Sequence, residues 1–342
     1  MRAAVLRDGR LEVRETEDPV PGPGELLLRT VSTAICASDV HYMDHPRPES
    51  SGLFAWDAER DVVMGHEFVG EVVAYGPSCS GTFPLGSRVT AMPALIRDAQ
   101  VQVIGAHPDA TGSFGELFVV SESLARPVPP DADPDRVALC DVFAVGEGYV
   151  SLSQLGTDEL PLVIGAGAVG LSTVAALAGK GLDPILIADR HDQRRELSSQ
   201  FGPTIGVNPS LRDPFELWQE VAREHQIVKP PVVFECAGVS GLLQKIVDTC
   251  PQGTRIFSSG GWFTEDTLQV NPATMRGLQI QFGGAPDGAA WYRTLDAILS
   301  GRLDPGPAIG MTVGLDRVPE AVELARRGTG PPRIIIRPTF DL

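Results

Sequence analysis

The stretch from Leu160 to Asp189 constrains the fold more than any other part of this sequence. A short apolar run, Leu162-Val-Ile, leads into Gly165-Ala-Gly167-Ala-Val-Gly170, and an uncharged helical segment follows from Leu171 to Ala178. A second apolar run then ends at Asp189. Glycines at this spacing, between a strand and a helix, allow a tight turn that lets a dinucleotide pyrophosphate approach the helix N-terminus. The stretch therefore predicts the first strand–helix–strand unit of a doubly wound parallel sheet.

The same stretch supplies the candidate cofactor-binding residues, which are Gly165, Gly167, Ala168, Val169, Gly170, Asp189 and Arg190. A carboxylate at Asp189 accepts hydrogen bonds from ribose hydroxyls and repels a 2′-phosphate, which favours NAD over NADP. The adjacent Arg190 would weaken that preference. Asp192 is an alternative acid, but it lies beyond the strand. A nucleotide-free sheet of the same type is the alternative interpretation.

The chain has two regions that differ in their pattern of expected strands and helices. It has 342 residues, which is longer than a domain with a single hydrophobic core usually is, so we expect two domains. Up to about residue 140, short alternating strands are separated by turns rich in Gly and Pro, which is typical of a partly closed β-barrel. From Leu160 onward strands alternate with helices, which indicates a parallel sheet. The expected strands include 3–6, 11–14, 25–32, 68–74, 87–91, 114–120, 162–164, 184–188, 232–236, 255–259, 278–282 and 333–337.

Charge and cysteine content exclude several classes of partner. The net charge of −16 and the absence of basic clusters exclude nucleic-acid binding. The five scattered cysteines indicate reduced thiols, and the charged N-terminus is no signal peptide. The uncharged stretch 160–179 contains Pro161 and four glycines, so a buried strand, turn and helix explain it better than a membrane span. We expect a cytoplasmic protein that does not bind membranes.

A second motif points to a metal. Cys36 precedes Ser38 and Asp39, and Gly65-His66-Glu67 with Gly70 follows some thirty residues later. A thiolate, an imidazole and a carboxylate are ligands that suit Zn²⁺. Taken singly, Cys36 could be a small buried hydrophobe and His66 with Glu67 a structural ion pair. The combination, together with the nucleotide loop, predicts metal-assisted hydride transfer.

On these motifs the chain resembles the medium-chain dehydrogenase/reductase family, the zinc-dependent alcohol and polyol dehydrogenases. The resemblance extends over nearly the whole length and includes the opening residues 1–6, Pro21-Gly-Pro-Gly-Glu25 and Glu235-Cys-Ala-Gly238. It implies an α/β protein with a GroES-like β-barrel catalytic domain at 1–150. A Rossmann domain with a doubly wound parallel sheet follows at 151–285, and residues 286–342 return to the catalytic domain.

The resemblance also implies roles for particular residues. Cys36 and His66 would bind zinc, and either Asp141 or Glu67 would complete the shell. Asp141 could instead cap a helix that begins near Val142. The catalytic set would be completed by Ser38, His41 and Asp39. Ser38 and His41 stand at the positions of a proton relay, and Asp39 would hydrogen-bond His66. His41 could also be an ordinary surface histidine.

Three departures from the family pattern bear on the function. Residues 88–115 contain no cysteine, so we expect one catalytic zinc and no structural zinc. Residues 46–61 form an insert with two aromatic side chains that either cover the substrate or form a plain surface loop. Glu147 adds a charge to the helix where relatives have small polar residues. Candidate pocket residues are Phe54, Trp56, Phe143 and Trp262.

These observations predict a zinc-dependent oxidoreductase that transfers hydride between NAD and a secondary alcohol, polyol or sugar-like hydroxyl. A biosynthetic ketone or aldehyde reductase using NAD(P)H is the alternative. A non-catalytic NAD- or zinc-binding protein is disfavoured because a structural zinc needs no proton relay. The partner would be a small alcohol or carbonyl compound. A homodimer or homotetramer built through the sheet edge at 278–282 is also expected.

Overall fold

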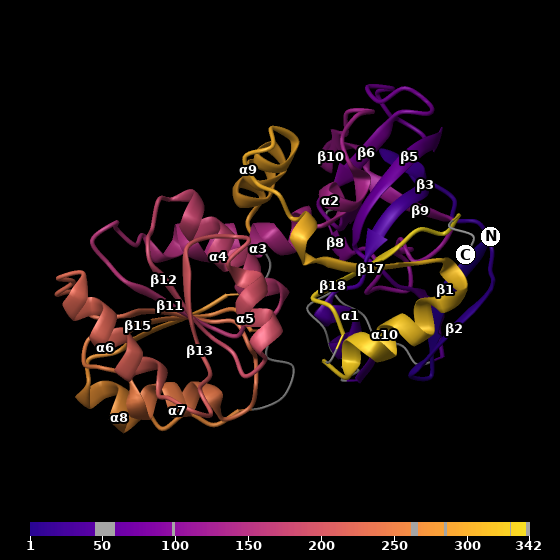
Figure 1. Ribbon diagram of the computed structural model, residues 1–342. Helices are drawn as coiled ribbons and strands as arrows, with labels where there is room; N and C mark the ends of the chain where they lie inside the picture. Colours follow the sequence, from indigo (N-terminus) through magenta and orange to yellow (C-terminus); the bar gives the residue numbers. More distant parts are fainter. Residues whose placement is uncertain (45–58, 98–99, 261–265, 284–285, 329, 340–342) are drawn as a thin grey trace. The chain divides into compact units, whose positions relative to one another are not determined.

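The computed structural model describes residues 1–44, 59–97, 100–260, 266–283, 286–328 and 330–339. The chain forms two compact units (Figure 1). The first contains Met1–Asp141, Ile298–Ser300 and Ile309–Leu342, and the second contains Val142–Ala297 and Gly301–Ala308. The domain limits expected at 150 and 285 remain proposals. In the described part of the chain, no helix has both the length and the apolar composition needed to cross a bilayer.

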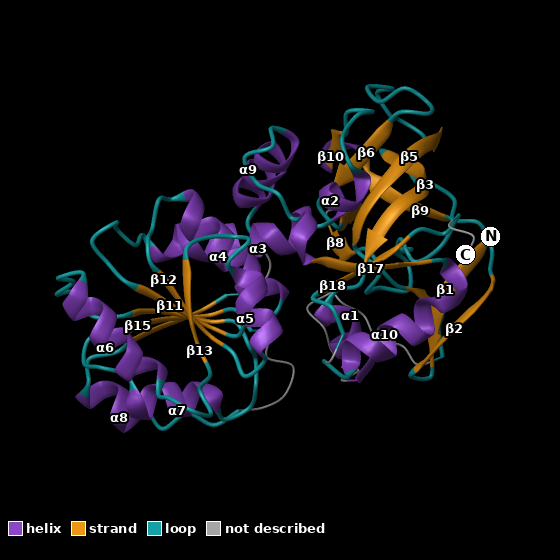
Figure 2. Cartoon of the chain, in the orientation of Figure 1, coloured by secondary structure: helices purple, strands orange, loops and turns teal. Residues whose placement is uncertain are grey.

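The first unit is built mainly from strands (Figure 2). Its largest sheet has the strand order β10 (Ala125–Pro127), β6 (Arg88–Ala91), β5 (Glu67–Tyr75), β3 (Glu25–Ala34), β18 (Arg333–Ile336) and β17 (Ile309–Val313), with β9 (Leu117–Ser121) also paired to β3. A smaller sheet has the order β2 (Arg10–Glu15), β1 (Arg2–Arg7) and β4 (Val62–Val63), and β7 (Ala94–Arg97) forms a hairpin with β8 (Gln100–Val103). The helices of this unit are α1 (Ala37–Asp44), α2 (Pro134–Ala138) and α10 (Val318–Arg326).

Two of these pairings explain how the sequence folds locally. β1 and β2 form the hairpin expected around Asp8-Gly9, and both turn residues have positive φ, which suits glycine and aspartate. The last strand returns to the first unit from the far end of the chain. β18 runs antiparallel to β3, with Ile335 opposite Ala34, so the C-terminal segment lies beside the residues that follow β3.

The second unit contains the expected parallel sheet. Its strands lie in the order β13 (Thr204–Val207), β12 (Ile185–Ala188), β11 (Pro161–Ile164), β14 (Val232–Glu235), β15 (Arg255–Ser258) and β16 (Gln279–Phe282). Every neighbouring pair is parallel. The order reverses between β11 and β14, which is the doubly wound arrangement. The prediction of fold class is confirmed.

Helices connect these strands and cover the sheet. They are α3 (Cys140–Ser153), α4 (Ala168–Gly179), α5 (Asp192–Ser198), α6 (Pro214–Glu224), α7 (Leu242–Thr249), α8 (Val270–Met275) and α9 (Gly288–Leu299). α6 shows why a segment of this sequence becomes a helix. Asp213 caps it by accepting a hydrogen bond from the Phe215 N–H, Pro214 occupies the first turn, and Trp218 faces the core.

A buried ion pair ties the β7–β8 hairpin to β3. Glu25 is 1% exposed and receives Arg97 through two contacts, Nε to Oε1 at 2.6 Å and Nη2 to Oε2 at 2.9 Å. The Gly22 N–H donates to the same carboxylate at 2.8 Å. The hairpin lies within residues 88–115, which contain no cysteine that could bind a structural zinc. In this segment the bidentate ion pair holds the hairpin against β3.

We expect Arg97→Met to lower the free energy of unfolding by about 3 kcal/mol, because Glu25 would remain buried without its countercharge. Denaturant unfolding of the purified protein measures this. Arg29→Met is the matched control, since its pair with Glu71 is exposed and worth less than about 1 kcal/mol. Equal losses in the two variants would contradict the prediction.

Candidate functional site

Cys36, His66 and Glu67 meet in the first unit, and their ligand atoms all lie within 4.8 Å of one another. Cys36 lies between β3 and α1, and His66 immediately precedes β5. In the β3–β5 pairing, Ala34 is opposite Glu67. This register brings two segments that are distant in the sequence to the same place. The structure therefore groups three of the four candidate metal ligands.

Gly65 shapes the approach of the chain to His66. Its φ is +97°, and a Cβ added there would lie 2.3 Å from the ring of Phe114. Both the conformation and the space require glycine at this position. The glycine before His66 is thus a condition for placing the imidazole.

Asp39 holds two of the candidate ligands at once. The carboxyl group is 2% exposed; its Oδ2 accepts a hydrogen bond from the Cys36 N–H at 2.9 Å, and its Oδ1 lies 3.2 Å from His66 Nδ1. The contact expected between Asp39 and His66 is therefore present. It leaves Nε2 of the ring as the nitrogen available to a metal, in the manner of carboxylate–histidine pairs around zinc.

Ser38 and His41 both belong to α1. Ser38 Oγ lies 3.1 Å from His66 Nε2, so the hydroxyl is adjacent to the metal donors. His41 follows three positions later and shares that side of the helix. Both residues are half-buried. Their role as a proton relay remains a prediction.

Arg333 is a site residue that the sequence analysis did not identify. It belongs to β18, is 2% exposed, and donates from Nη1 to the Ile35 carbonyl oxygen at 2.8 Å. Its Nη2 lies 3.2 Å from Glu67 Oε1, which is an ion-pair distance, yet neither Glu67 oxygen accepts a well-aligned hydrogen bond in the described part of the chain. An arginine in a strand that is otherwise Ile334-Ile-Ile is an unusual charge among apolar residues, and that signal could have identified it.

The cluster is a dense group of buried and half-buried ionisable side chains. Burial raises the pKa of Glu67 to about 8, against the opposing influence of Arg333. Burial also raises the pKa of the Cys36 thiol, but Arg333 and His66 outweigh it and leave the pKa below its ordinary value. Burial lowers the pKa of His66, whereas Asp39 and Cys36 raise it well above the usual range. The site therefore favours a thiolate.

The donor set fits zinc. One thiolate, one imidazole and one carboxylate are ligands that this ion accepts. The unpartnered oxygens of Glu67 are buried, and a cation would satisfy them. Asp141 is not part of this group. It lies in the first turn of α3, which begins at Cys140, so the alternative interpretation of Asp141 as the N-cap residue does not hold.

The second unit contains the nucleotide loop. Gly165 has φ +102°. A Cβ on Gly170 would lie 1.8 Å from the carbonyl oxygen of Gly165, so the two glycines pack against each other. A Cβ on Gly167 would meet nothing within 4 Å. Gly167 is also the N-cap of α4, without a side-chain cap, so open space adjoins the free N–H groups of that helix. This arrangement fits a pyrophosphate.

Asp189 follows β12 and is bonded to the same loop. Its Oδ2 accepts the Ala166 N–H at 2.9 Å, and its Oδ1 accepts the His191 N–H at 2.8 Å. Burial raises the pKa of Asp189, but these hydrogen bonds outweigh it and hold the pKa below its ordinary value. Arg190 is exposed, whereas Asp192 pairs with Arg195 in α5. The carboxylate at Asp189 is therefore fixed and ionised.

Several expected pocket residues are placed differently or not described. Phe143 is 2% exposed and packs against Phe201 at 5.7 Å between ring centroids, so it is a core residue and not a pocket wall. Phe54, Trp56 and Trp262 lie outside the described residues, as does most of the insert 46–61.

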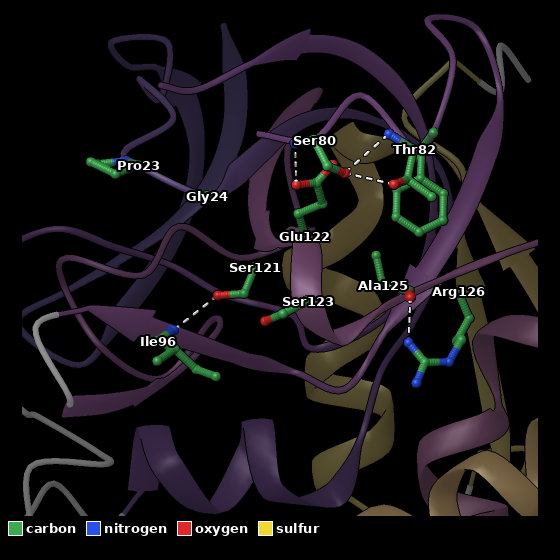
Figure 3. A pocket seen from close by; sticks show the side chains of 11 residues that line it. Pro23, Gly24, Ser80, Thr82, Ile96, Ser121, Glu122, Ser123, Ala125 and Arg126 are labelled. Atoms are coloured by element: carbon green, nitrogen blue, oxygen red, sulfur yellow. Dashed lines mark hydrogen bonds between the residues drawn. The ribbon is translucent and has the colours of Figure 1, made fainter. Parts of the chain in front are cut away.

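Figure 3 shows a surface hollow of about 460 Å³ in the first unit. Ser80 and Glu122 are hydrogen-bonded in its wall. None of the candidate metal or nucleotide residues lines this hollow. It is therefore separate from the sites considered above.

Comparisons with known proteins agree with the fold of the chain. The family model "Alcohol dehydrogenase GroES-like domain" matches residues 22–130. An L-threonine 3-dehydrogenase of Thermococcus kodakarensis is 25% identical over 333 residues, covering 93% of this chain and 92% of that protein. The 2R,3R-butanediol dehydrogenase of Bacillus subtilis has a TM-score of 0.83 at 22% identity, covering 99% of both chains. An alcohol dehydrogenase of Escherichia coli CFT073, solved with NADH, has a TM-score of 0.82 at 22% identity, covering 98% and 99%.

We expect Cys36→Ser to abolish zinc binding and Asp39→Asn to weaken it by about 10- to 100-fold, because Asp39 orients the ligands. Cobalt titration monitored by the thiolate-to-metal absorption band measures both effects. Cys79→Ser is the control, since that thiol donates to the Glu25 carbonyl oxygen elsewhere in the same unit. A thiolate band that persists in Cys36→Ser would refute the site.

Asp189→Ser is expected to weaken NADH binding by about tenfold and to strengthen NADPH binding, because a hydroxyl neither repels a 2′-phosphate nor fully replaces the carboxylate. Equilibrium binding of both cofactors gives the ratio. Asp192→Ser is the matched control, and its cofactor ratio should equal that of the wild type. An unchanged ratio in Asp189→Ser would contradict the assignment.

Proposed function

The chain belongs to the zinc-dependent medium-chain dehydrogenase/reductase family, and on that basis we propose that it transfers hydride between a secondary alcohol and NAD. It is an oxidoreductase that uses zinc and a nicotinamide cofactor. The observation that carries the finer proposal is the close group of Cys36, His66 and Glu67, with the Ser38 hydroxyl beside it. We assign a single zinc ion per chain to this group, with Asp141 as an alternative ligand to Glu67.

The chain's own residues perform the proton chemistry. Bound zinc supplies a Lewis acid that lowers the pKa of an alcohol hydroxyl. Asp39 keeps His66 in one tautomer and one orientation, since it contacts Nδ1. Ser38 accepts the proton of the substrate hydroxyl, and His41 carries it onward to solvent. The removal of that proton allows the carbon to release hydride to the nicotinamide.

The cofactor proposal is NAD rather than NADP. It is supported by the ionised Asp189 beside the loop, because a carboxylate there accepts hydrogen bonds from the ribose hydroxyls and repels a 2′-phosphate. Arg190 is exposed and would moderate the preference without reversing it, because it does not displace the carboxylate.

The names of the relatives support a secondary hydroxyl as the reacting group. L-Threonine carries one at carbon 3, and butanediol in its 2,3-form carries two. Polyols and sugar-like alcohols share that group. A reductase acting on the corresponding ketones with NAD(P)H uses the same residues and is the alternative direction. A non-catalytic role is disfavoured by the position of Ser38 beside the ligands.

The proposals for assembly and location rest on a sheet edge and on the cysteines. β16 is the edge of the six-stranded sheet and exposes Phe282, so we propose a homodimer or homotetramer built through this edge. The cytoplasm remains the predicted location because the cysteines are unpaired.

We expect the zinc-loaded protein to reduce NAD with at least one member of a panel of secondary alcohols, polyols and 3-hydroxy amino acids. Ser38→Ala should lower kcat by about 10²- to 10⁴-fold, because a positioned proton acceptor is lost. Absorbance of NADH measures both. Ser80→Ala, an exposed serine of the same unit, should match the wild type. Full activity in Ser38→Ala would eliminate the relay, and inactivity with every panel member would eliminate the proposed substrate class.

A further inference from the structure

Tyr149 has a buried hydroxyl with no partner. The residue lies in α3 and is 5% exposed, and its phenolic oxygen makes no hydrogen bond in the described part of the chain. An unpaired buried hydroxyl destabilises the folded state, and native proteins contain few of them. The hydroxyl therefore marks a place where a polar ligand group would be stabilised.

The position of this hydroxyl follows from its neighbours. A Cβ added to Gly283 would lie 2.6 Å from Tyr149 Oη, and Gly283 directly follows β16. Cys236 and Glu235, at the end of β14, are close enough to contribute to the raised pKa of the same hydroxyl. The phenol thus lies at the carboxyl ends of the strands in one half of the parallel sheet.

Other polar groups at these strand ends already have partners. Glu235 accepts the N–H groups of Ala237 and Gly238 at 2.8 Å each. Ser259 Oγ donates to the Glu235 carbonyl oxygen at 3.2 Å, and Thr173 Oγ1 donates to the Val169 carbonyl oxygen at 2.8 Å. Tyr149 is the exception in this group. Burial raises its pKa above the ordinary value, so the hydroxyl remains protonated and can donate.

The sheet order indicates which ligand group reaches this place. Under the proposed function, Asp189 would bind the adenosine ribose at the end of β12 and the loop after β11 would bind the pyrophosphate. The dinucleotide then has to continue in the other direction, over β14, β15 and β16. The loop already adjoins that half, since a Cβ on Gly165 would lie 3.0 Å from Ala237 after β14. The nicotinamide end consequently reaches the strands beside Tyr149.

We propose that the Tyr149 hydroxyl donates a hydrogen bond to the carboxamide oxygen of the bound nicotinamide and so fixes the orientation of the ring. This inference rests on the proposed function, because it requires a nicotinamide dinucleotide as cofactor. Tyr149 is then a cofactor-binding residue that the loop motif does not reveal. The hydrogen bond orients the ring and transfers no proton.

The test compares two ligands in Tyr149→Phe. NADH should bind about tenfold more weakly than in the wild type, whereas ADP-ribose, which lacks nicotinamide, should bind equally well. Calorimetry measures both affinities on the full-length protein. Tyr75→Phe is the matched control, because its hydroxyl donates to the Phe83 carbonyl oxygen at 2.7 Å in the first unit. Neither affinity should change in that variant.

A stability measurement separates binding from folding. Without cofactor, Tyr149→Phe should have a Tm no lower than the wild type, since it removes an unpaired group, whereas Tyr75→Phe should have a lower Tm. A lower Tm for Tyr149→Phe, unchanged NADH affinity, or a parallel loss of ADP-ribose affinity would each overturn the inference. Wild-type protein that binds neither NADH nor ADP-ribose would overturn the proposed function as well. Equally tight NADH binding by the wild type and by Tyr149→Phe would overturn only the role of Tyr149.

Discussion

The register between β3 and β5 is the constraint on which the metal site depends. Ala34 lies opposite Glu67, so the residues just beyond β3 meet the residues at the start of β5. A shift of one position would turn Glu67 to the other face of the sheet and separate the donor atoms. β18 strengthens the arrangement, because its pairing with β3 places Arg333 against the Ile35 carbonyl oxygen.

Arg333 makes an otherwise unstable group of charges possible. A thiol and two carboxylates lie close together in a buried place, where each charge alone would be costly. The guanidinium is the buried cation that opposes them, and it lowers the pKa of both Cys36 and Glu67 against the effect of burial. It does not complete the hydrogen bonds of Glu67, so the carboxylate retains the capacity to bind a metal.

The two halves of the parallel sheet in the second unit are proposed to bind different parts of the cofactor. The reversal of strand order between β11 and β14 separates the half that holds Asp189 and the glycine loop from the half that holds Tyr149. In the first half, the groups available to the cofactor are the free N–H groups at the start of α4 and the carboxylate of Asp189. In the second half, Glu235 accepts the N–H groups of Ala237 and Gly238 directly after β14. The proposed hydrogen bond there comes from a side chain of α3.

The sequence by itself determined many local features: the strands other than β4, β7, β8, β10, β13 and β17, the loop Gly165–Gly170, the acid at Asp189, and Cys36, Asp39 and His66 as neighbours. Short-range chemistry sets these, since turns need glycine and zinc selects its ligand types. The sequence analysis misjudged Phe143, which is a core residue, because burial depends on packing between distant segments. Only the tertiary structure decided the positions of Arg333 and Tyr149. Arg333 reaches Glu67 from the last strand, and Tyr149 reaches Gly283 from a separate helix, so no spacing in the sequence relates them.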